Sequence, residues 1–299
     1  MLKNAQKDFI QRHIGPSVEE QNIMLKELGY KNLDELIKNT VPENILLKDD
    51  LGIGDPNSEY KALRKLKNIS KKNKVYSSFI GMGYYGTYTP YVILRNILEN
   101  PGWYTSYTPY QPEVAQGRLE MLMNFQQMII DFTGMDIANA SLLDESTAAA
   151  EAMMMAYKIK KSKQHTFCLQ NTCHPQTISV LKTRANPLGI KIIEGEPNND
   201  TFGCFIQNPD TYGEIHDLES YISKNKSLEI ISIVAADIMS LVIMKSPGSY
   251  NVDIVIGSSQ RFGVPMGLGG PHAAFFATKD EFKRLMPGRL IGVSVDRNN

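Results

Sequence analysis

The sequence has few cysteines, no net charge and no long apolar run. Its only cysteines are Cys168, Cys173 and Cys204, and none are spaced as CxxC, which argues against a disulfide framework and a metal site of the zinc type. The 32 basic residues match 32 acidic ones, so the usual electrostatic basis for binding nucleic acid or an anionic membrane is missing. The most apolar stretch, 230–244, is shorter than the roughly 20 residues that cross a bilayer.

The first 15 residues resemble neither a signal peptide nor a transit peptide. A cytoplasmic location is therefore expected, where the three thiols stay reduced and buried. With nucleic acid and membrane set aside as partners, small-molecule chemistry and protein assembly are the function classes that remain.

The pattern along the chain predicts three segments. Residues 1–75 form a helical lead-in, and their lysine-rich stretch 60–74 indicates either a solvated helix face or a docking site for an acidic partner. Residues 76–118 are rich in glycine, proline and tyrosine, which is typical of shaped loops. Residues 119–299 alternate helical and β-rich runs, which predicts an α/β domain with a doubly wound, mainly parallel sheet.

Hydrophobic spacing places the elements of this last segment. Helices are expected over about 119–132, ended by Gly134, and over 147–160 and 176–184. Strands are expected at 166–169, 190–194, 204–207, 230–236, 253–257 and 273–277. In a sheet of this kind, ligands bind at the carboxyl ends of the strands.

Candidate site residues stand at the ends of these elements. Ser146 and Thr147 begin an alanine-rich helix whose free N–H groups could bind a phosphate, unless Ser146 or Asp144 merely caps the helix. Asp237 ends a buried strand, where its carboxylate could hold a protonated ring nitrogen or cap the next helix. His174 by itself is interpreted as a cap or packing residue, and it becomes a candidate site residue only together with these other candidates.

A glycine-rich loop follows the strand near residue 257. Gly267, Gly269 and Gly270 indicate either close approach of the backbone to a ligand or another chain, or a plain turn between strands. The loop is no dinucleotide fingerprint, because a strand follows it instead of a helix.

The order of these features is the order found in pyridoxal-phosphate enzymes of the aspartate-aminotransferase fold. That order requires a lysine at its last station, the turn after the strand 253–257, since Schiff-base chemistry needs an amine there. The turn reads Ser258-Ser-Gln-Arg-Phe262 instead, and no lysine occurs between Lys245 and Lys279. Neither of these two lysines stands at the expected station, which disfavours an independent pyridoxal-phosphate enzyme.

Several longer motifs resemble one family from end to end. They are Arg12-His-Ile-Gly-Pro16, Phe79-Ile-Gly-Met-Gly-Tyr-Tyr85, Glu99-Asn-Pro-Gly-Trp103, Tyr107-Thr-Pro-Tyr-Gln-Pro-Glu113, Gln116-Gly-Arg-Leu-Glu120, Ala138-Asn-Ala-Ser141, Thr147-Ala-Ala-Ala-Glu-Ala152, Cys173-His-Pro-Gln-Thr177 and Ser259-Gln-Arg-Phe-Gly-Val-Pro265. The sequence is similar to the glycine decarboxylase (P-protein) family of the glycine cleavage system, in the N-terminal half of the long form, or subunit 1 where the enzyme is split.

The resemblance implies a fold type I large domain and a reaction. The family decarboxylates glycine with pyridoxal phosphate and transfers the aminomethyl group to the lipoyl arm of the H-protein. Its Schiff-base lysine belongs to the C-terminal half, or subunit 2, and that station falls here on Gln260, or on Arg261 if a gap is placed differently. The cofactor is therefore expected mainly on the lysine-bearing partner half and not covalently on this chain.

The resemblance also implies roles for parts of this half. Tyr84 and Tyr85, with a second group formed by Tyr107, Tyr110 and Gln111, are expected in loops that line the shared cleft or pack at the interface. The family has a small residue where this chain has Ser146, and the carboxylates of Asp144 and Glu145 beside it make phosphate binding less favourable.

The chain ends where the family continues into a small domain, so a truncated fragment is expected. A homo-oligomer is possible, because an interface left bare would be a large apolar patch. The alternative to a catalytic component is a non-catalytic scaffold or pseudo-enzyme fragment that serves only assembly.

Overall fold

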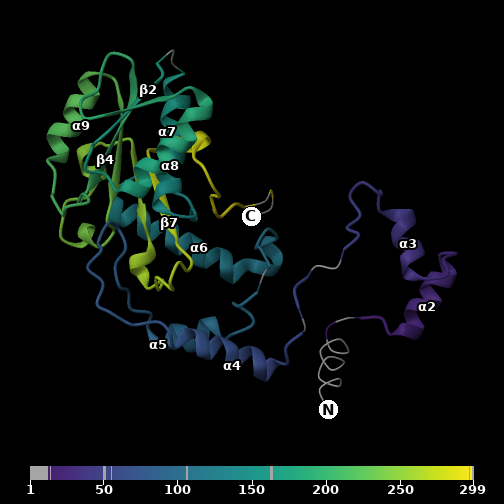
Figure 1. Ribbon diagram of the computed structural model, residues 1–299. Helices are drawn as coiled ribbons and strands as arrows, with labels where there is room; N and C mark the ends of the chain where they lie inside the picture. Colours follow the sequence, from purple (N-terminus) through teal and green to yellow (C-terminus); the bar gives the residue numbers. More distant parts are fainter. Residues whose placement is uncertain are drawn as a thin grey trace. The chain divides into compact units, whose positions relative to one another are not determined.

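The computed structural model describes residues 13, 15–49, 52–54, 56–105, 107–161, 164–295 and 297 (Figure 1). They belong to two compact units, 1–77 and 78–299. Arg12 and Ile14 of the run 12–16, and the residues 1–12 that were examined for a signal peptide, lie outside the described residues. The division into a lead-in, a loop segment and a truncated large domain stays a prediction.

The second unit is built on one seven-stranded sheet. Its strands are β1 (Ile137–Ala138), β2 (Thr166–Leu169), β3 (Lys191–Glu194), β4 (Thr201–Asn208), β5 (Ile231–Ala236), β6 (Ile254–Ser258) and β7 (Ala274–Thr278). The order is β1-β7-β6-β5-β4-β2-β3, parallel from β3 through β6, with β7 antiparallel to β6 and β1 antiparallel to β7. The predicted α/β fold with a mainly parallel sheet is confirmed.

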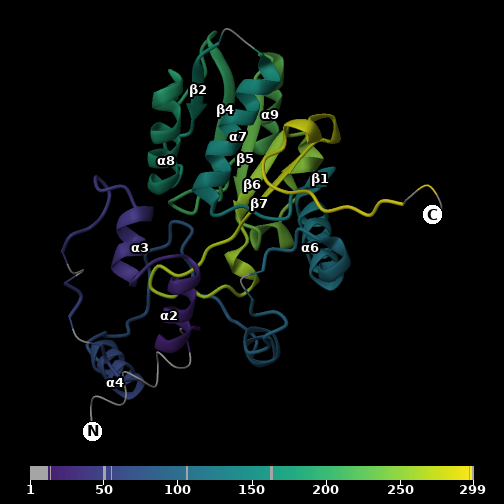
Figure 2. The same ribbon diagram turned by 90° about the vertical axis from the view of Figure 1, so that its right-hand side faces the viewer.

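Helices cover both faces of this sheet (Figure 2). On one face α7 (Glu145–Lys160) and α8 (Pro175–Ala185) bury a core that includes Ile233. On the other face α6 (Pro112–Thr133) and α9 (Leu218–Ser227) bury a core that includes Val234. Neighbouring residues of β5 thus enter opposite cores, as the alternation of side chains along a strand requires. The sheet is doubly wound, as expected.

Helix α6 begins earlier than the sequence pattern predicted. It starts at Pro112 instead of residue 119, and it ends at Gly134 in the left-handed conformation, as expected. Proline suits the first turn because that position has no intrahelical N–H bond to lose. Ala115 leaves the helical region with φ −129°, so the first turn is set off by a kink. Gly117 had marked this stretch as loop, but the helix accommodates it.

The remaining helices of the second unit are short. They are α5 (Tyr91–Ile93), the π-helix η1 (Leu94–Leu98) and the 3₁₀-helices η2 (Asn186–Leu188), η3 (Ser240–Val242), η4 (Pro247–Tyr250), η5 (Gln260–Phe262) and η6 (Asp280–Leu285). None of the helices in the described parts of the chain combines the length and the apolar character needed to span a membrane.

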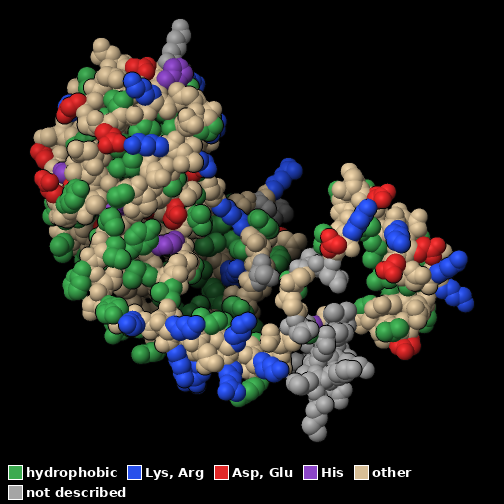
Figure 3. All heavy atoms as spheres, viewed as in Figure 1, with side chains coloured by type: hydrophobic (Ala, Val, Ile, Leu, Met, Phe, Trp, Pro, Cys, Tyr) green, Lys and Arg blue, Asp and Glu red, His purple; other side chains and the backbone are tan. Residues whose placement is uncertain are grey.

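Among its described residues, the first unit has the helices α2 (Val18–Glu27), α3 (Leu33–Thr40) and α4 (Glu59–Ser70). Ser17 and Glu20 form a capping box that begins α2, since each side chain accepts the other residue's backbone N–H. Basic side chains gather over α4 (Figure 3). The structure gives them no acidic partner among the residues it describes, and they are exposed.

Candidate functional site

A pocket opens at the carboxyl ends of the parallel strands β4, β5 and β6. We call it the strand-end pocket. Its lining is Gly83, Tyr85, Thr87, Glu145, His174, Gln207, Pro209, Asp237, Ser258, Gln260 and Arg261. A smaller pocket beside it shares Gly83, Glu145 and Ser258 with it. The sheet therefore brings several of the predicted site residues together where doubly wound folds hold their ligands.

Asp237 and Arg261 form an ion pair inside this pocket. The Arg261 guanidinium donates from Nη2 to Asp237 Oδ2 at 2.7 Å and from Nε to Oδ1 at 3.2 Å. The guanidinium also lies 3.8 Å from the centre of the Tyr85 ring. Asp237 Oδ1 accepts the Met239 N–H at 3.1 Å as well, so this aspartate also supports the turn before η3. The two oxygens of this carboxylate thus accept three hydrogen bonds from the protein itself.

Glu145, the first residue of α7, is the pocket's most perturbed acid. Burial raises its pKa to about 7, and the negative charges of Asp237 and Asp144 act in the same direction. Hydrogen bonds from the Ser258 backbone and the Gln207 side chain oppose the rise. A carboxyl group with this pKa exchanges its proton near neutrality, unlike an ordinary surface glutamate.

The start of α7 already holds a carboxylate. Asp144 caps the helix, because its Oδ1 accepts the Thr147 N–H at 2.7 Å. Ser146 makes no capping bond; its hydroxyl lies 3.2 Å from the hydroxyl of Thr177. Of the two capping alternatives, the structure thus has Asp144. A phosphate at Ser146 and Thr147 stays a prediction, and it would have to approach this carboxylate.

His174 lies buried directly before α8. Its Nδ1 is 3.0 Å from the Thr211 hydroxyl, and burial lowers the pKa of the imidazole. The backbone of Gly83 passes close to the ring, where a Cβ would stand 3.3 Å from the imidazole. Gly83 also has φ +82°, a conformation that favours glycine. The lack of a side chain thus lets this segment cover the histidine.

The segment 83–91 lies against the pocket and the loop after η5. Thr87 Oγ1 donates to the Val264 carbonyl at 2.8 Å, and Thr89 Oγ1 donates to the Gly263 carbonyl at 2.5 Å. Tyr84 meets His272 edge to face, with ring centres 5.6 Å apart. Tyr84 and Tyr85, both expected in a cleft loop, therefore lie at the two adjoining pockets.

The other expected loop residues lie outside the strand-end pocket. Tyr107 donates from its hydroxyl to Gln111 Oε1 at 3.1 Å, and Arg118 donates to the Tyr107 carbonyl at 2.6 Å. Tyr110 stacks on Arg289 with 5.3 Å between guanidinium and ring centre, and Arg289 donates to the Pro109 carbonyl at 2.7 Å. Two arginines therefore hold this loop in place.

The three glycines of the loop between β6 and β7 also lie outside the pocket. The Gly270 N–H donates to the Met266 carbonyl at 2.8 Å, which closes a turn. Gly267 and Gly269 have positive φ and are exposed. In this structure the loop joins two antiparallel strands, and contact with a ligand or another chain stays a prediction.

No lysine lines the strand-end pocket as the structure describes it. Gln260 is only 3% exposed there, and its Nε2 has no hydrogen-bond partner. Lys245 lies over the ring of Tyr250, and Lys279 pairs with Asp253. The station assigned to the Schiff-base lysine therefore presents an amide and a guanidinium.

Sequence reasoning missed Glu145 and Gln207 as pocket residues. The signal for Gln207 was a polar side chain that ends the apolar run of β4. Glu145 gave no such signal, because an acidic residue in the first turn of a helix is normally exposed and favoured by the helix dipole. Only the folded chain shows that it faces Ser258 and Gln207.

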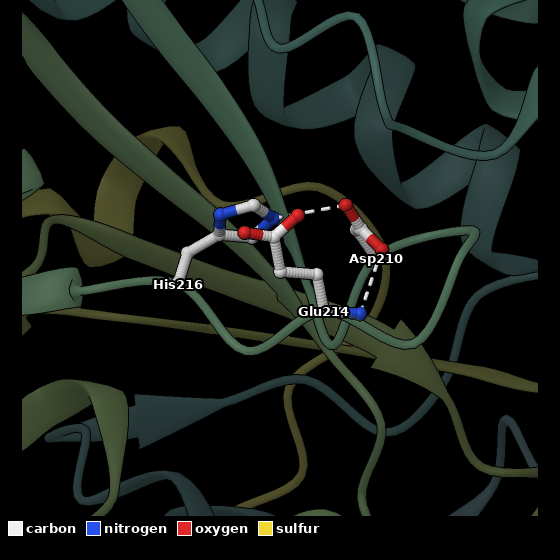
Figure 4. A group of neighbouring side chains, drawn as sticks. All are labelled: Asp210, Glu214 and His216. Carbon is white, nitrogen blue, oxygen red and sulfur yellow. Dashed lines mark hydrogen bonds and ion pairs between the residues drawn. The ribbon is translucent and has the colours of Figure 1, made fainter.

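One group of ionisable side chains lies beside the pocket, in the turn after β4 (Figure 4). Asp210 Oδ1 accepts the N–H groups of Tyr212 and Glu214, and its Oδ2 lies 3.0 Å from His216 Nε2. Although burial acts to raise it, these hydrogen bonds hold the pKa of Asp210 below its usual value. The side chain of Asp210 thus holds the turn after β4 together through its hydrogen bonds to three residues of the same turn.

Comparison with known proteins assigns nearly the whole chain to a family. The family described as glycine cleavage system P-protein matches residues 11–299. The chain belongs to the glycine cleavage system P-protein family. The resemblance seen in the sequence motifs is therefore confirmed.

Two curated members of the P-protein family show how similar the sequences are and how much of each chain is matched. Glycine dehydrogenase (decarboxylating) of Pelagibacter ubique (strain HTCC1062) is 72% identical over 302 residues, which cover all of this chain and 32% of that protein. The same enzyme of Idiomarina loihiensis is 56% identical over 97% of this chain and 31% of its own length. The chain thus spans about a third of the length of these relatives.

A solved structure supports the fold of the P-protein family for this chain. A crystal structure of glycine decarboxylase (P-protein) of the glycine cleavage system, in inhibitor-bound form, superimposes with a TM-score of 0.87 at 31% identity. The match covers 96% of this chain and 67% of that chain. The fold type I architecture expected from the motifs is confirmed.

Proposed function

We propose that this chain is the supporting part of a glycine decarboxylase. A lysine-bearing half would hold pyridoxal phosphate, decarboxylate glycine and pass the aminomethyl group to the lipoyl arm of the H-protein. The observation that carries the proposal is the pocket of a P-protein fold whose lysine station is Gln260, followed by an arginine paired with Asp237. Pyridoxal phosphate supplies the electron sink for decarboxylation when bound to that half.

The residues of the strand-end pocket do not fit pyridoxal phosphate. Covalent attachment requires an amine, and no amine lines the pocket as described. A protonated ring nitrogen requires a free carboxylate, but Asp237 already accepts two bonds from Arg261. A phosphate requires free N–H groups at the helix start, but Asp144 already accepts the Thr147 N–H and places its own carboxylate there. These three observations support cofactor binding on the partner half alone.

The parts of the chain that would support the partner are its two tyrosine segments. Tyr84 and Tyr85 belong to the segment 83–91, and their rings contact His272 and Arg261 at the two pockets. The loop of Tyr107, Tyr110 and Gln111 is held by Arg118 and Arg289 at its base. We place the first segment at the shared cleft. The second, whose Tyr110 is exposed, is placed at the interface.

The decisive experiment produces this chain together with a lysine-bearing P-protein half. Release of labelled carbon dioxide from glycine is measured with oxidised lipoylated H-protein, and borohydride reduction is followed by peptide mapping. The expected result is activity only with both halves and a pyridoxyl group only on the partner. A pyridoxyl group on a lysine of this chain would overturn the proposal.

An assembly role alone is the competing function, and the closed Arg261–Asp237 pair favours it. The two functions differ in what Tyr84 does. In a fully assembled enzyme, Tyr84→Ala lowers kcat for glycine if the segment supports the cleft. If the same variant changes only the affinity between the halves, with kcat retained at saturation, the chain is a scaffold.

A further inference from the structure

We propose that Arg261 is a positioning residue that closes the strand-end pocket and anchors the segment 83–91 over it. The anchoring follows from the geometry of this chain. Its importance for catalysis rests on the proposed function, because that function places the segment at a cleft shared with the lysine-bearing half.

Arg261 joins three parts of the fold. It belongs to η5, it bonds through Nε and Nη2 to the carboxylate that follows β5, and its guanidinium lies under the ring of Tyr85. The Asp237 and Arg261 side chains are 23% and 26% exposed, so water screens the pair only in part. A planar guanidinium can make both contacts at once, which a lysine ammonium cannot.

The loop that carries Arg261 also holds the segment directly. The carbonyls of Gly263 and Val264 accept the hydroxyls of Thr89 and Thr87. Gly263 has φ +118°, and a Cβ there would stand 3.0 Å from the Tyr88 carbonyl. The loop and the segment are therefore in close contact, and Arg261 links this contact to the sheet.

Charge gives the arginine a further role. Burial raises the pKa of Glu145, and the negative charge of Asp237 acts in the same direction. Without Arg261, the Asp237 carboxylate would have no cation in the pocket as described, and it would remain near a second acid. We therefore expect loss of Arg261 to open the pocket, which would free Tyr85 and the segment that contains it.

Hydrogen exchange in the assembled two-half enzyme tests the proposal. Arg261→Ala is expected to speed exchange of amides in 83–91 by about tenfold, with exchange in β4 and β5 unchanged. Arg261→Lys is expected to restore part of the protection, since it keeps the charge but not the fork. Arg184→Ala is the matched control, because Arg184 makes a surface ion pair with Glu151. It should leave 83–91 unchanged.

Two further variants keep the test decisive if Arg261→Ala does not assemble. Asp237→Asn removes the charge partner, and Tyr85→Leu removes the stacked ring; each should loosen 83–91 on its own. Protection within about twofold of wild type in either folded variant would overturn the proposal. So would equal loosening by Arg184→Ala. If glycine decarboxylation fails in the wild-type assembly while Arg261→Ala still loosens 83–91, the proposed function fails and the anchoring role stands.

Discussion

Lys279 donates from Nζ to Asp253 Oδ1 at 2.5 Å, at the end of β6 opposite the strand-end pocket. The register of β6 and β7 pairs Ile254 with Thr278, which fixes Lys279 beside the start of β6. Asp253 Oδ2 also accepts the Ser232 N–H at 2.8 Å. The lysine therefore ties three strands together and is far from the station of a Schiff base.

Replacing Lys279 should change stability and not cofactor chemistry. Lys279→Ala leaves the Asp253 carboxylate without its cation, so the free energy of unfolding should fall by about 1–3 kcal/mol. Urea denaturation measures this change. Lys283→Ala, which removes an exposed pair with Asp280, should change it by less than about 0.5 kcal/mol. Equal losses in both variants would show that the Lys279 contact has no special weight.

Glu145 should make stability depend on pH. Burial raises its pKa from an ordinary 4.5 to about 7, so the folded state keeps this proton at pH values where the unfolded chain has lost it. Stability from this group is therefore greatest below about pH 4.5, falls as pH rises to about 7, and then stays level. Glu145→Gln should be more stable than wild type by about 3 kcal/mol at pH 8.

Urea denaturation of Glu145→Gln and wild type between pH 5 and pH 8 measures this difference. The stability advantage of the variant should shrink steadily as pH falls. An advantage that stays constant across this range would contradict the raised pKa. It would indicate instead that the amide simply makes better hydrogen bonds to Ser258 and Gln207.

The sequence predicted the layers of the fold better than its strand directions. Alternating apolar runs identify β4 and β5 as buried strands, and the helices between them imply parallel pairing. The run that became β7 has the same composition but pairs antiparallel with β6. The hydrophobicity of a strand indicates that it is buried but not which way it runs in the sheet. The antiparallel direction of β7 therefore depends on the loop 259–273, which connects it to β6.

The candidate site was predictable where it depends on strand ends. Asp237, Gln260 and Arg261 follow buried strands, and the fold brings them into one pocket. The ion pair between Arg261 and Asp237 was not predictable. The two residues are 24 positions apart in the sequence, and their contact depends on how η5 packs beside the end of β5. The motif Tyr-Thr-Pro-Tyr occurs at 88–91 and again at 107–110, and its two copies show the same limit. One packs on the loop after η5, and the other is held by Arg118.

Gly257 should be essential for the shape of the pocket. A Cβ at this position would stand 2.2 Å from the Ala236 carbonyl oxygen and 2.5 Å from the Phe275 ring. Gly257→Ala must therefore push β5 away from β6 immediately before Asp237, and it should lower the free energy of unfolding by about 2–4 kcal/mol. Gly292→Ala is the control, since nothing lies within 4 Å of a Cβ there. Thermal unfolding compares the two, and similar melting temperatures would refute the steric argument.

Tyr110 offers the sharpest test of the proposed interface. Its side chain is 74% exposed although Arg289 holds the loop, so truncation should leave the fold of this chain intact. Exposed aromatic side chains on an anchored loop are typical contact residues of protein interfaces. Tyr110→Ala should weaken binding of the lysine-bearing half by about tenfold, which sedimentation of the diluted assembly can measure. Tyr212→Ala removes a ring that is 82% exposed in the turn after β4, and it serves as the matched control. If both variants dissociate at the same concentration as wild type, the loop of Tyr107, Tyr110 and Gln111 does not contact the partner. The interface would then have to lie on another surface of the chain.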